Sequence, residues 1–255
     1  GVPFQAGQRV MAFVPLGGFA ERVACPAKNI VPIPPDMDFK VAAASSMVYG
    51  TSYYALKQRA NLKKGETLLV LGASGGCGMA AVQLGKAMGA RVIAAASTAE
   101  KLEVARKNGA DEVINYTQQD LRATVKALTK KKGVDVVFDP VGGAFAEPAL
   151  RCVGWGGRFL VIGFAAGKIP KIPLNLPLLK SSAVVGVFWG AWVQRCPMEA
   201  MENMMEISMM MQEGTIKPLI SKVYPLSQTW KALDDIAKRK VIGKVVVCPE
   251  TKSKL

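Results

Sequence analysis

The sequence predicts an α/β protein built on a doubly wound parallel sheet, with a second, smaller β-rich part. An apolar run, LLVL at 68–71, leads into a glycine-rich turn and then into apolar residues at helical spacing. Further short apolar runs alternate with amphipathic segments up to about residue 190. Fully apolar strands between amphipathic helices are typical of a parallel sheet that is covered on both faces.

The alternation predicts the elements of this sheet in order. A helix follows each of the first four strands. We expect strands at 67–71, 91–96, 112–115, 134–138, 157–162 and 183–189, with helices at about 76–88, 98–107, 118–131 and 145–152.

The two ends of the chain do not follow this alternation. Polar and apolar residues alternate at 7–14 and 19–26, which predicts short strands, and a proline-rich connection follows them. From Phe39 the pattern becomes helical, as one or two helices broken around Gly50. We expect three domain segments: 1–46 from a β-containing domain, 47–190 binding a nucleotide, and 191–255 returning to the first domain through a helix, a strand, a helix and a strand at 197–212, 221–224, 227–239 and 244–248.

Composition indicates a globular protein, with 50% hydrophobic and 20% charged residues. The longest uncharged apolar stretch, 183–193, is shorter than the ~18 residues that a membrane span needs. The formal charge of +14 favours anionic ligands, or residence in the mitochondrial matrix or the cytoplasm. Because the cations are spread along the chain, with one tight cluster at Lys130–Lys132, we do not expect dedicated RNA binding.

Metal chemistry is not expected from these residues. The chain has no histidine, and its five cysteines are odd in number and lack zinc-ligand spacing. This excludes a histidine-ligated metal and a Ser-His-Asp hydrolase within the sequence. The cysteines are expected to be reduced and structural.

The glycine-rich turn after the first strand predicts a phosphate site. Gly72, Gly75, Gly76 and Gly78 allow a sharp turn and let a pyrophosphate approach backbone amides at a helix N-terminus. The alternative is that these glycines serve only tight packing between the strand and the helix.

The end of the second strand indicates which nucleotide is bound. Enzymes that bind NAD usually carry Asp or Glu there, to hold the ribose 2′-hydroxyl. Here the strand ends in Ser97, and Lys101 follows one helical turn later. A hydroxyl and a cation suit a 2′-phosphate, which predicts NADPH; the alternative for Lys101 is a solvated helix face.

Several runs together resemble one family. They are LVLGASGGCGMAAVQLGKAMGARVIA, GADEVINY, VDVVFDPVGG, GGRFLVIGFAAG and IGKVVV. The chain is similar over essentially its whole length to the zinc-independent quinone oxidoreductase group of the medium-chain dehydrogenase/reductase family. The resemblance implies a Rossmann-type domain and an incomplete GroES-like catalytic domain.

The resemblance also implies a set of cofactor-binding residues. No catalytic residue is named among them, and Asp139 in FDPVGG is expected to cap a turn rather than to act in catalysis. Alternatives stay open for three of them: Tyr116 as a strand-end aromatic, Phe188 as a core or dimer contact with its neighbours Trp189 and Trp192, and Arg239 as a solvated helix end. The implied set is Thr51, Gly72, Gly75, Gly76, Cys77, Gly78, Ser97, Lys101, Tyr116, Val141, Gly142, Gly163, Phe164, Ala165, Val187, Phe188 and Arg239.

The implied activity is hydride transfer from NADPH to a quinone or an α,β-unsaturated carbonyl, without a metal. Family members carry a longer N-terminal segment before AGQRV, and we expect it to be missing here. Either the numbering starts inside a longer protein, or half of the substrate domain is lost. The alternative function is therefore a weakly active or inactive subunit of a larger, mitochondrial assembly.

Two apolar segments predict contacts with other surfaces. The run AVVGVFWG is too apolar to leave exposed, so we expect a homodimer joined along 184–189. The helix at 197–212 carries seven methionines, which predicts either an adaptable core or a face for an irregular partner or a hydrophobic substrate.

Overall fold

The computed structural model describes residues 4–250, and the chain divides into two compact units. The larger unit is Met47–Lys217, and the smaller combines Gly1–Ser46 with Pro218–Leu255. The larger unit extends to Lys217 because α8 (Pro197–Gln212) contributes Ile207 to its core. The domain segments 1–46, 47–190 and 191–255 stay a prediction.

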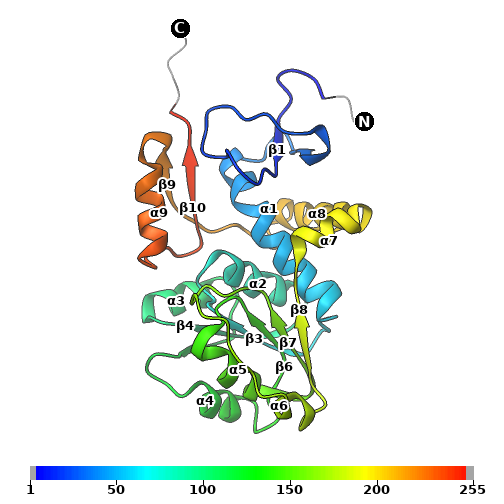
Figure 1. Cartoon of the computed structure of the whole chain (residues 1–255), viewed down its shortest axis with the longest axis vertical. Helices are drawn as coiled ribbons and strands as arrows, with labels where there is room; N and C mark the ends of the chain where they lie inside the picture. Colours follow the sequence, from blue (N-terminus) through cyan, green and yellow to red (C-terminus); the bar gives the residue numbers. More distant parts are fainter. Residues whose placement is uncertain (1–3, 251–255) are drawn as a thin grey trace. The chain divides into compact units, whose positions relative to one another are not determined.

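The larger unit is organised around a six-stranded parallel sheet (Figure 1). Its order is β5-β4-β3-β6-β7-β8, so the chain winds outward from β3 first in one direction and then in the other. This confirms the predicted doubly wound α/β class. The strands are β3 (Thr67–Leu71), β4 (Arg91–Ala96), β5 (Glu112–Asn115), β6 (Val134–Asp139), β7 (Val153–Val161) and β8 (Ala183–Gly186).

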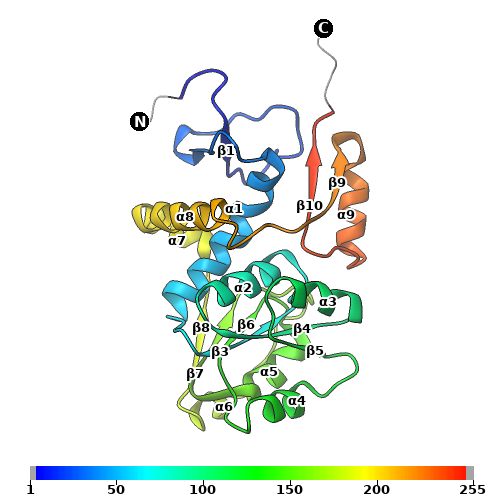
Figure 2. The same ribbon diagram turned by 180° about the vertical axis from the view of Figure 1, so that it is seen from behind.

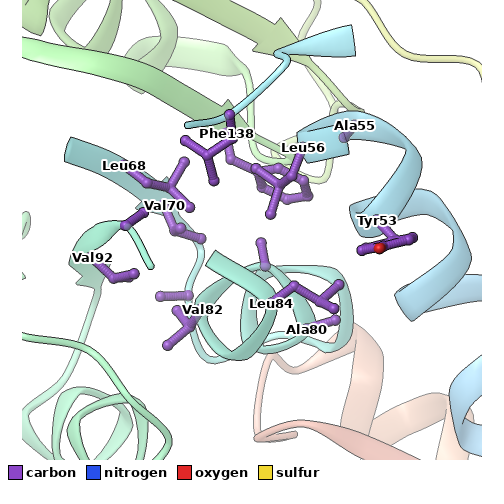
Figure 3. Packing of buried hydrophobic residues seen from close by; sticks show 14 of the residues in the cluster. Tyr53, Ala55, Leu56, Leu68, Val70, Ala80, Val82, Leu84, Val92 and Phe138 are labelled. Atoms are coloured by element: carbon purple, nitrogen blue, oxygen red, sulfur yellow. The ribbon is translucent and has the colours of Figure 1, made fainter. Parts of the chain in front are cut away.

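Alternate side chains of β3 enter two separate cores. Leu68 and Val70 pack on one face of the sheet, where Figure 3 shows them with residues of α2 and of neighbouring strands. Leu69 and Leu71 belong to the core on the other face. Both pairs of side chains are fully buried, so a one-residue shift of β3 would only move one apolar pair into the core of the other. Burial alone therefore does not set the register of β3, and pairing with the neighbouring strands β4 and β6 is also needed.

Helices cover both faces of this sheet (Figure 2). One core takes residues from α1, η2, α2, α3 and α8, and the other takes them from α4 and α5, with Leu176 of α6 packed beside it. The bounds are α1 (Phe39–Tyr54), the π-helix η2 (Ala55–Arg59), α2 (Gly76–Ala87), α3 (Ala99–Lys107), α4 (Leu121–Leu128), the 3₁₀ turn η3 (Gly143–Phe145), α5 (Ala146–Cys152), α6 (Asn175–Leu178) and α7 (Trp189–Arg195).

The smaller unit contains two short sheets. Strands β1 (Val10–Ala12) and β2 (Ile30–Pro32) pair antiparallel, with the 3₁₀ turn η1 (Ala27–Asn29) before β2. Strands β9 and β10 pair in parallel, joined by a helix. Their bounds are β9 (Ile220–Pro225), η4 (Leu226–Gln228), α9 (Thr229–Ala237) and β10 (Lys244–Cys248).

Two expectations for the N-terminal part are wrong. Residues 19–26 do not form a strand, because β1 pairs with β2 and leaves that segment without a partner among the described residues. The helix from Phe39 does not break at Gly50 either. It continues to Tyr54 and passes directly into η2.

The last strand of the sheet is shorter than the predicted 183–189. It ends at Gly186, and Trp189 begins α7 instead. The aromatic side chains explain this: a Cβ on Gly50 would lie 2.7 Å from the Trp189 ring, and the Trp192 ring stacks on Tyr54 at 4.3 Å. Packing on α1 therefore turns the segment into a helix.

Helix α4 is also shorter than the predicted 118–131. Asp120 caps its start by accepting a hydrogen bond from the Ala123 amide at 2.6 Å. Its end is followed by a turn in which Lys130 and Lys131 both have positive φ, 51° and 68°.

None of the helices within residues 4–250 combines the length and the apolar character that crossing a membrane requires.

An ion pair ties β7 to the start of β3. Arg158 donates from Nη1 and Nη2 to the two carboxylate oxygens of Glu66, each at 2.8 Å, and the side chains are only 19% and 22% exposed. Burial by itself would raise the pKa of Glu66, but hydrogen bonds from Arg158 and from the Lys63 amide lower it below its usual value. The charged form of Glu66 therefore stabilises the fold.

We predict that Glu66→Gln lowers the free energy of unfolding by about 2 kcal/mol at neutral pH, since one charge-assisted interaction is lost. Because the pKa of Glu66 is lowered on folding, this contribution is present above the unfolded pKa and disappears as the pH falls through the folded pKa. Urea denaturation at several pH values should show the difference between the proteins shrinking below about pH 4.

The control is Glu103→Gln, which removes a 3.7 Å pair with Lys107 on the exposed face of α3. We expect a change within about 0.5 kcal/mol for this control. Equal losses in the two variants would contradict the role given to the Glu66–Arg158 pair.

Candidate functional site

The glycine-rich turn between β3 and α2 is closed by direct backbone contact. Gly72 has a φ of 56°, and its carbonyl accepts the Gly75 amide at 3.0 Å. A Cβ on Gly78 would lie 2.2 Å from that same carbonyl oxygen and 2.8 Å from the Cα of Ala73. Only glycine permits this approach, so the packing of the turn requires glycine at position 78 whether or not a ligand binds.

The first turn of α2 is open to a ligand. The residue before the helix, Gly75, has no side chain to cap it, and a Cβ there would meet only the Gly72 carbonyl, at 3.5 Å. Amides at a helix start have no partner within the helix and attract anions. The backbone of Gly75, Gly76 and Gly78 thus lies at a helix start of this kind, and its contact with a phosphate stays a prediction.

Residues of α1 brace this turn from behind. The Ser52 hydroxyl donates to the carbonyl of Cys77 at 3.0 Å, and Ser52 is completely buried. Thr51, the predicted cofactor residue, is its half-buried neighbour. Ser52 was not predicted as a functional residue, and the only signal for it in the sequence is its position beside Thr51 on a predicted helix.

The ends of β4 and β5 bring two predicted residues together. Ser97 follows β4 directly, and its carbonyl accepts the hydroxyl of Thr117 at 3.1 Å. Tyr116 follows β5, and its amide donates to the carbonyl of Ala96 at 3.2 Å. These contacts place Ser97 and Tyr116 side by side at the carboxyl edge of the sheet.

Lys101 lies in the first turn of α3. Thr98 caps this helix and accepts the Lys101 amide at 3.3 Å, so Lys101 is placed within one turn of Ser97. The Tyr116 ring packs against Phe145 at 4.4 Å between centroids, beside a hollow of about 290 Å³. At this end of the edge, a hydroxyl, a cation and an aromatic ring are therefore near neighbours.

Asp139 ends β6 and shapes the next turn. Its Oδ1 accepts the amides of Val141 and Gly142, both at 2.8 Å, and the residue is 2% exposed. Burial raises the pKa of this carboxyl, and the two amide hydrogen bonds oppose that shift. The prediction that Asp139 caps the turn is confirmed.

The turns after β6 and β7 are interlocked. A Cβ on Gly142 would lie 2.9 Å from the Phe164 ring, and the Ala165 amide donates to the Pro140 carbonyl at 3.1 Å. The turn after β6 also contacts the glycine turn, because a Cβ on Gly72 would lie 2.8 Å from Cγ2 of Val141. The structure therefore brings the glycine turn together with the predicted residues of both later turns, Gly163 included.

The remaining predicted residues separate into three cases. Val187 continues from β8, and its amide donates to the Val161 carbonyl at 3.0 Å. Phe188 is 75% exposed, whereas Trp189 and Trp192 pack on α1 as described above. Arg239 belongs to the smaller unit, where it follows α9 with a φ of 56°, so its role at the cofactor stays a prediction.

Among residues 4–250, no three His, Cys, Asp or Glu side chains gather in a way that could hold a metal ion. None of the described cysteines forms a disulfide, and Cys152 is buried. The site consists instead of backbone amides, hydroxyls, one lysine and aromatic rings at the ends of parallel strands. This is the crevice in which open α/β sheets bind dinucleotides.

Comparison with known proteins identifies the family. Residues 76–207 match the family described as zinc-binding dehydrogenase. The chain is 36% identical over 242 residues to quinone oxidoreductase-like protein 2 of Bos taurus, a match that covers 94% of this chain and 69% of the relative. The chain belongs to the quinone oxidoreductase group of the medium-chain dehydrogenase/reductase family.

Other members of this group are similar to the same extent. The quinone oxidoreductase-like protein 2 homolog of Nematostella vectensis is 38% identical over 233 residues, and the chain spans 64% of its length. The crystal structure of Escherichia coli quinone oxidoreductase complexed with NADPH superposes with a TM-score of 0.89 at 30% identity, covering 96% of this chain and 76% of that one. The chain thus spans about two thirds of the length of its curated relatives.

We predict that Gly78→Ala lowers the free energy of unfolding by about 3 kcal/mol or prevents folding. The added Cβ would meet backbone atoms, which cannot move aside cheaply. Gly75→Ala is the matched control, because its Cβ would meet only one atom at 3.5 Å. Thermal unfolding followed by circular dichroism measures both, and equal stability of the two variants would contradict the backbone contact described.

Proposed function

We propose that this chain binds NADPH and that the protein transfers a hydride from it to a quinone or an α,β-unsaturated carbonyl, without a metal. The observation that carries the proposal is the grouping of Ser97, Lys101 and Tyr116 beside the glycine turn, with no carboxylate where β4 ends. Two similar structures, the Escherichia coli quinone oxidoreductase and a mycobacterial protein, are complexed with NADPH.

The fit of the cofactor to these residues follows from their chemistry. The amides over Gly75, Gly76 and Gly78 suit the pyrophosphate, and the Ser97 hydroxyl and the Lys101 ammonium suit the 2′-phosphate. Tyr116 and, in our proposal, Arg239 complete the adenosine end. The turns at Val141–Gly142 and Gly163–Ala165, together with Thr51, Val187 and Phe188, would lie along the nicotinamide half.

The reaction asks little of the protein beyond positioning. The nicotinamide, when bound, supplies the hydride, and an electron-poor carbon or quinone can accept it without a Lewis acid. The chain's residues hold the cofactor in one orientation, and the apolar side chains of Val187 and Phe188 offer a surface for a small hydrophobic acceptor. No acid is assigned, and the 255 residues contain no histidine.

We predict that Lys101→Ala lowers the affinity for NADPH by about tenfold and leaves the affinity for NADH unchanged, because only NADPH carries the 2′-phosphate. Lys107→Ala, at the exposed end of the same helix, should change neither. Fluorescence titration of both cofactors measures this. Equal losses for the two cofactors in Lys101→Ala would contradict the proposed 2′-phosphate contact.

The activity itself is tested with the full-length protein. Incubation with NADPH and 1,2-naphthoquinone, or with a small enone, should consume NADPH, which its near-ultraviolet absorbance reports. Gly75→Ala should fold normally but turn over more slowly, since its Cβ occupies space that the pyrophosphate would use. Binding of NADPH without consumption across a broad set of acceptors would reject the enzymatic part alone.

A second candidate is a nucleotide-binding subunit of a larger assembly with weak or no turnover. The observation that favours it is a stripe of exposed methionines along α8. The opposite side of this helix packs into the core through Ala200 and Ile207, so the helix serves both as core and as a free face. The stripe is Met198, Met201, Met205 and Met209. Residence in the mitochondrial matrix or in the cytoplasm is part of this proposal.

We also propose a homodimer joined along residues 184–189. Strand β8 is an edge of the six-stranded sheet, and Val184 is 44% exposed. Pairing two such edges would bury the apolar run and satisfy its free backbone groups.

We predict that Val184→Lys converts a dimer to a monomer in sedimentation measurements at micromolar concentration. Val223→Lys, at an equally exposed valine of β9, should leave the dimer intact. A monomeric wild-type protein would reject the dimer, and migration with a much larger assembly would favour the second candidate function.

A further inference from the structure

A basic pocket lies at the amino edge of the sheet, the edge opposite to the candidate cofactor site. It has a volume of about 240 Å³ and is formed where β6 and β7 begin and where the chain approaches β8. Six cationic side chains line it, and the described residues that line it include no carboxylate. They are Arg122, Lys126, Lys131, Lys132, Arg151 and Lys180.

Two glycines bring the walls of this pocket together. A Cβ on Gly133 would lie 2.7 Å from the Cys152 carbonyl, and a Cβ on Gly154 would lie 2.7 Å from the Lys132 carbonyl. The turn after α4 therefore touches the start of β7 through backbone alone. In the same turn Lys130 and Lys131 occupy left-handed conformations, which glycine or asparagine adopts at lower cost. Lysine at these positions is not explained by the backbone.

Most of these cations have no counter-charge among residues 4–250. Arg151 pairs with Glu147 at 2.6 Å, but the other five make no ion pair with any described residue. Lys180 donates to the carbonyls of Arg151 and Val153, at 2.8 and 2.6 Å, and one of its three N–H groups remains. The hydrogen bonds from Lys180 to the end of α5 explain the presence of this one lysine. They do not explain five cations that form no ion pair.

The potential inside the pocket is positive. Burial lowers the pKa of Lys180 below its usual value; Cys152 opposes this shift, and the charges of Arg122 and Arg151 add to it. The Cys152 thiol itself stays neutral, because burial raises its pKa to about 12. An anion in this space would gain from all five cations.

An exposed aromatic ring stands beside the cations. Trp155 lines the same pocket and is 77% exposed, so it contributes little to either core. An indole face can stack on a nucleobase and gains about 1–3 kcal/mol from doing so. A nucleotide-binding site needs cations for the phosphates and an exposed ring for the base, and this pocket has both.

We propose that this pocket binds a nucleoside polyphosphate, with the phosphates on the lysines and Arg122 and the base on Trp155. Several cations without an ion pair favour a polyphosphate over a single phosphate, and a pocket of only about 240 Å³ favours a mononucleotide over a long strand. The site lies at the opposite end of the parallel strands from the candidate NADPH site, so both can be filled at once. It does not depend on the proposed activity.

The test is calorimetric titration of the full chain with ATP, with and without excess NADPH. We expect binding that persists with NADPH present. The double variant Lys131→Gln/Lys132→Gln should lose about tenfold or more in ATP affinity. The control Lys107→Gln/Lys130→Gln removes the same number of charges, one from the same turn, outside the pocket lining, and should change the affinity less than about twofold.

A second variant separates the base from the phosphates. Trp155→Ala should weaken ATP binding about tenfold and leave the binding of inorganic triphosphate unchanged. Equal losses in the two double variants, displacement of all ATP by NADPH, or no ATP binding by the wild type would overturn the proposal. A single-stranded oligonucleotide that binds more tightly than ATP, and is lost in the same variant, would replace the nucleotide with a nucleic acid.

Discussion

The contact between Gly78 and the carbonyl of Gly72 is the constraint on which the candidate site depends. A side chain at Gly78 would have to occupy the space of backbone atoms only 2.2 Å away. Because this contact lets α2 start directly behind β3, the first amides of the helix point at the crevice. The same turn contacts Ser52 of α1 and Val141 of the turn after β6, so a change in its conformation would also move these two segments.

The parallel arrangement gives the two edges of the sheet different chemistry. The ends of the six strands place most of the predicted cofactor residues of the larger unit along the carboxyl edge, where turns are tight and rich in glycine. At the amino edge, the segments before β6 and before β8 bring lysines together, and two glycines bring them closer. One fold thus provides two anion-attracting surfaces, one built mainly from backbone amides and one from side-chain charges.

Much of the larger unit could be predicted from the chain itself. Strands β3 and β4 occur where apolar runs predict them, because each run is buried on both faces. Strand β5 also has its predicted bounds, although Glu112 and Val113 are only half-buried. Predictions were wrong where a neighbour decided the outcome: Trp189 entered a helix because it packs over Gly50, and residues 19–26 found no strand to pair with. Of the site, the glycine turn and the cap role of Asp139 were predictable, whereas the support from Ser52 was not.

The doubly wound class, the glycine turn and the lysine in place of a carboxylate after β4 can all be predicted from the amino-acid sequence, since each depends on residue type and local spacing. Which distant residues meet depends on the fold. Lys131 and Lys180 stand about 50 positions apart in the chain, yet they line one pocket because parallel strands begin at one edge. A local sequence pattern cannot predict this proximity, because the proximity depends on the order of the strands in the sheet.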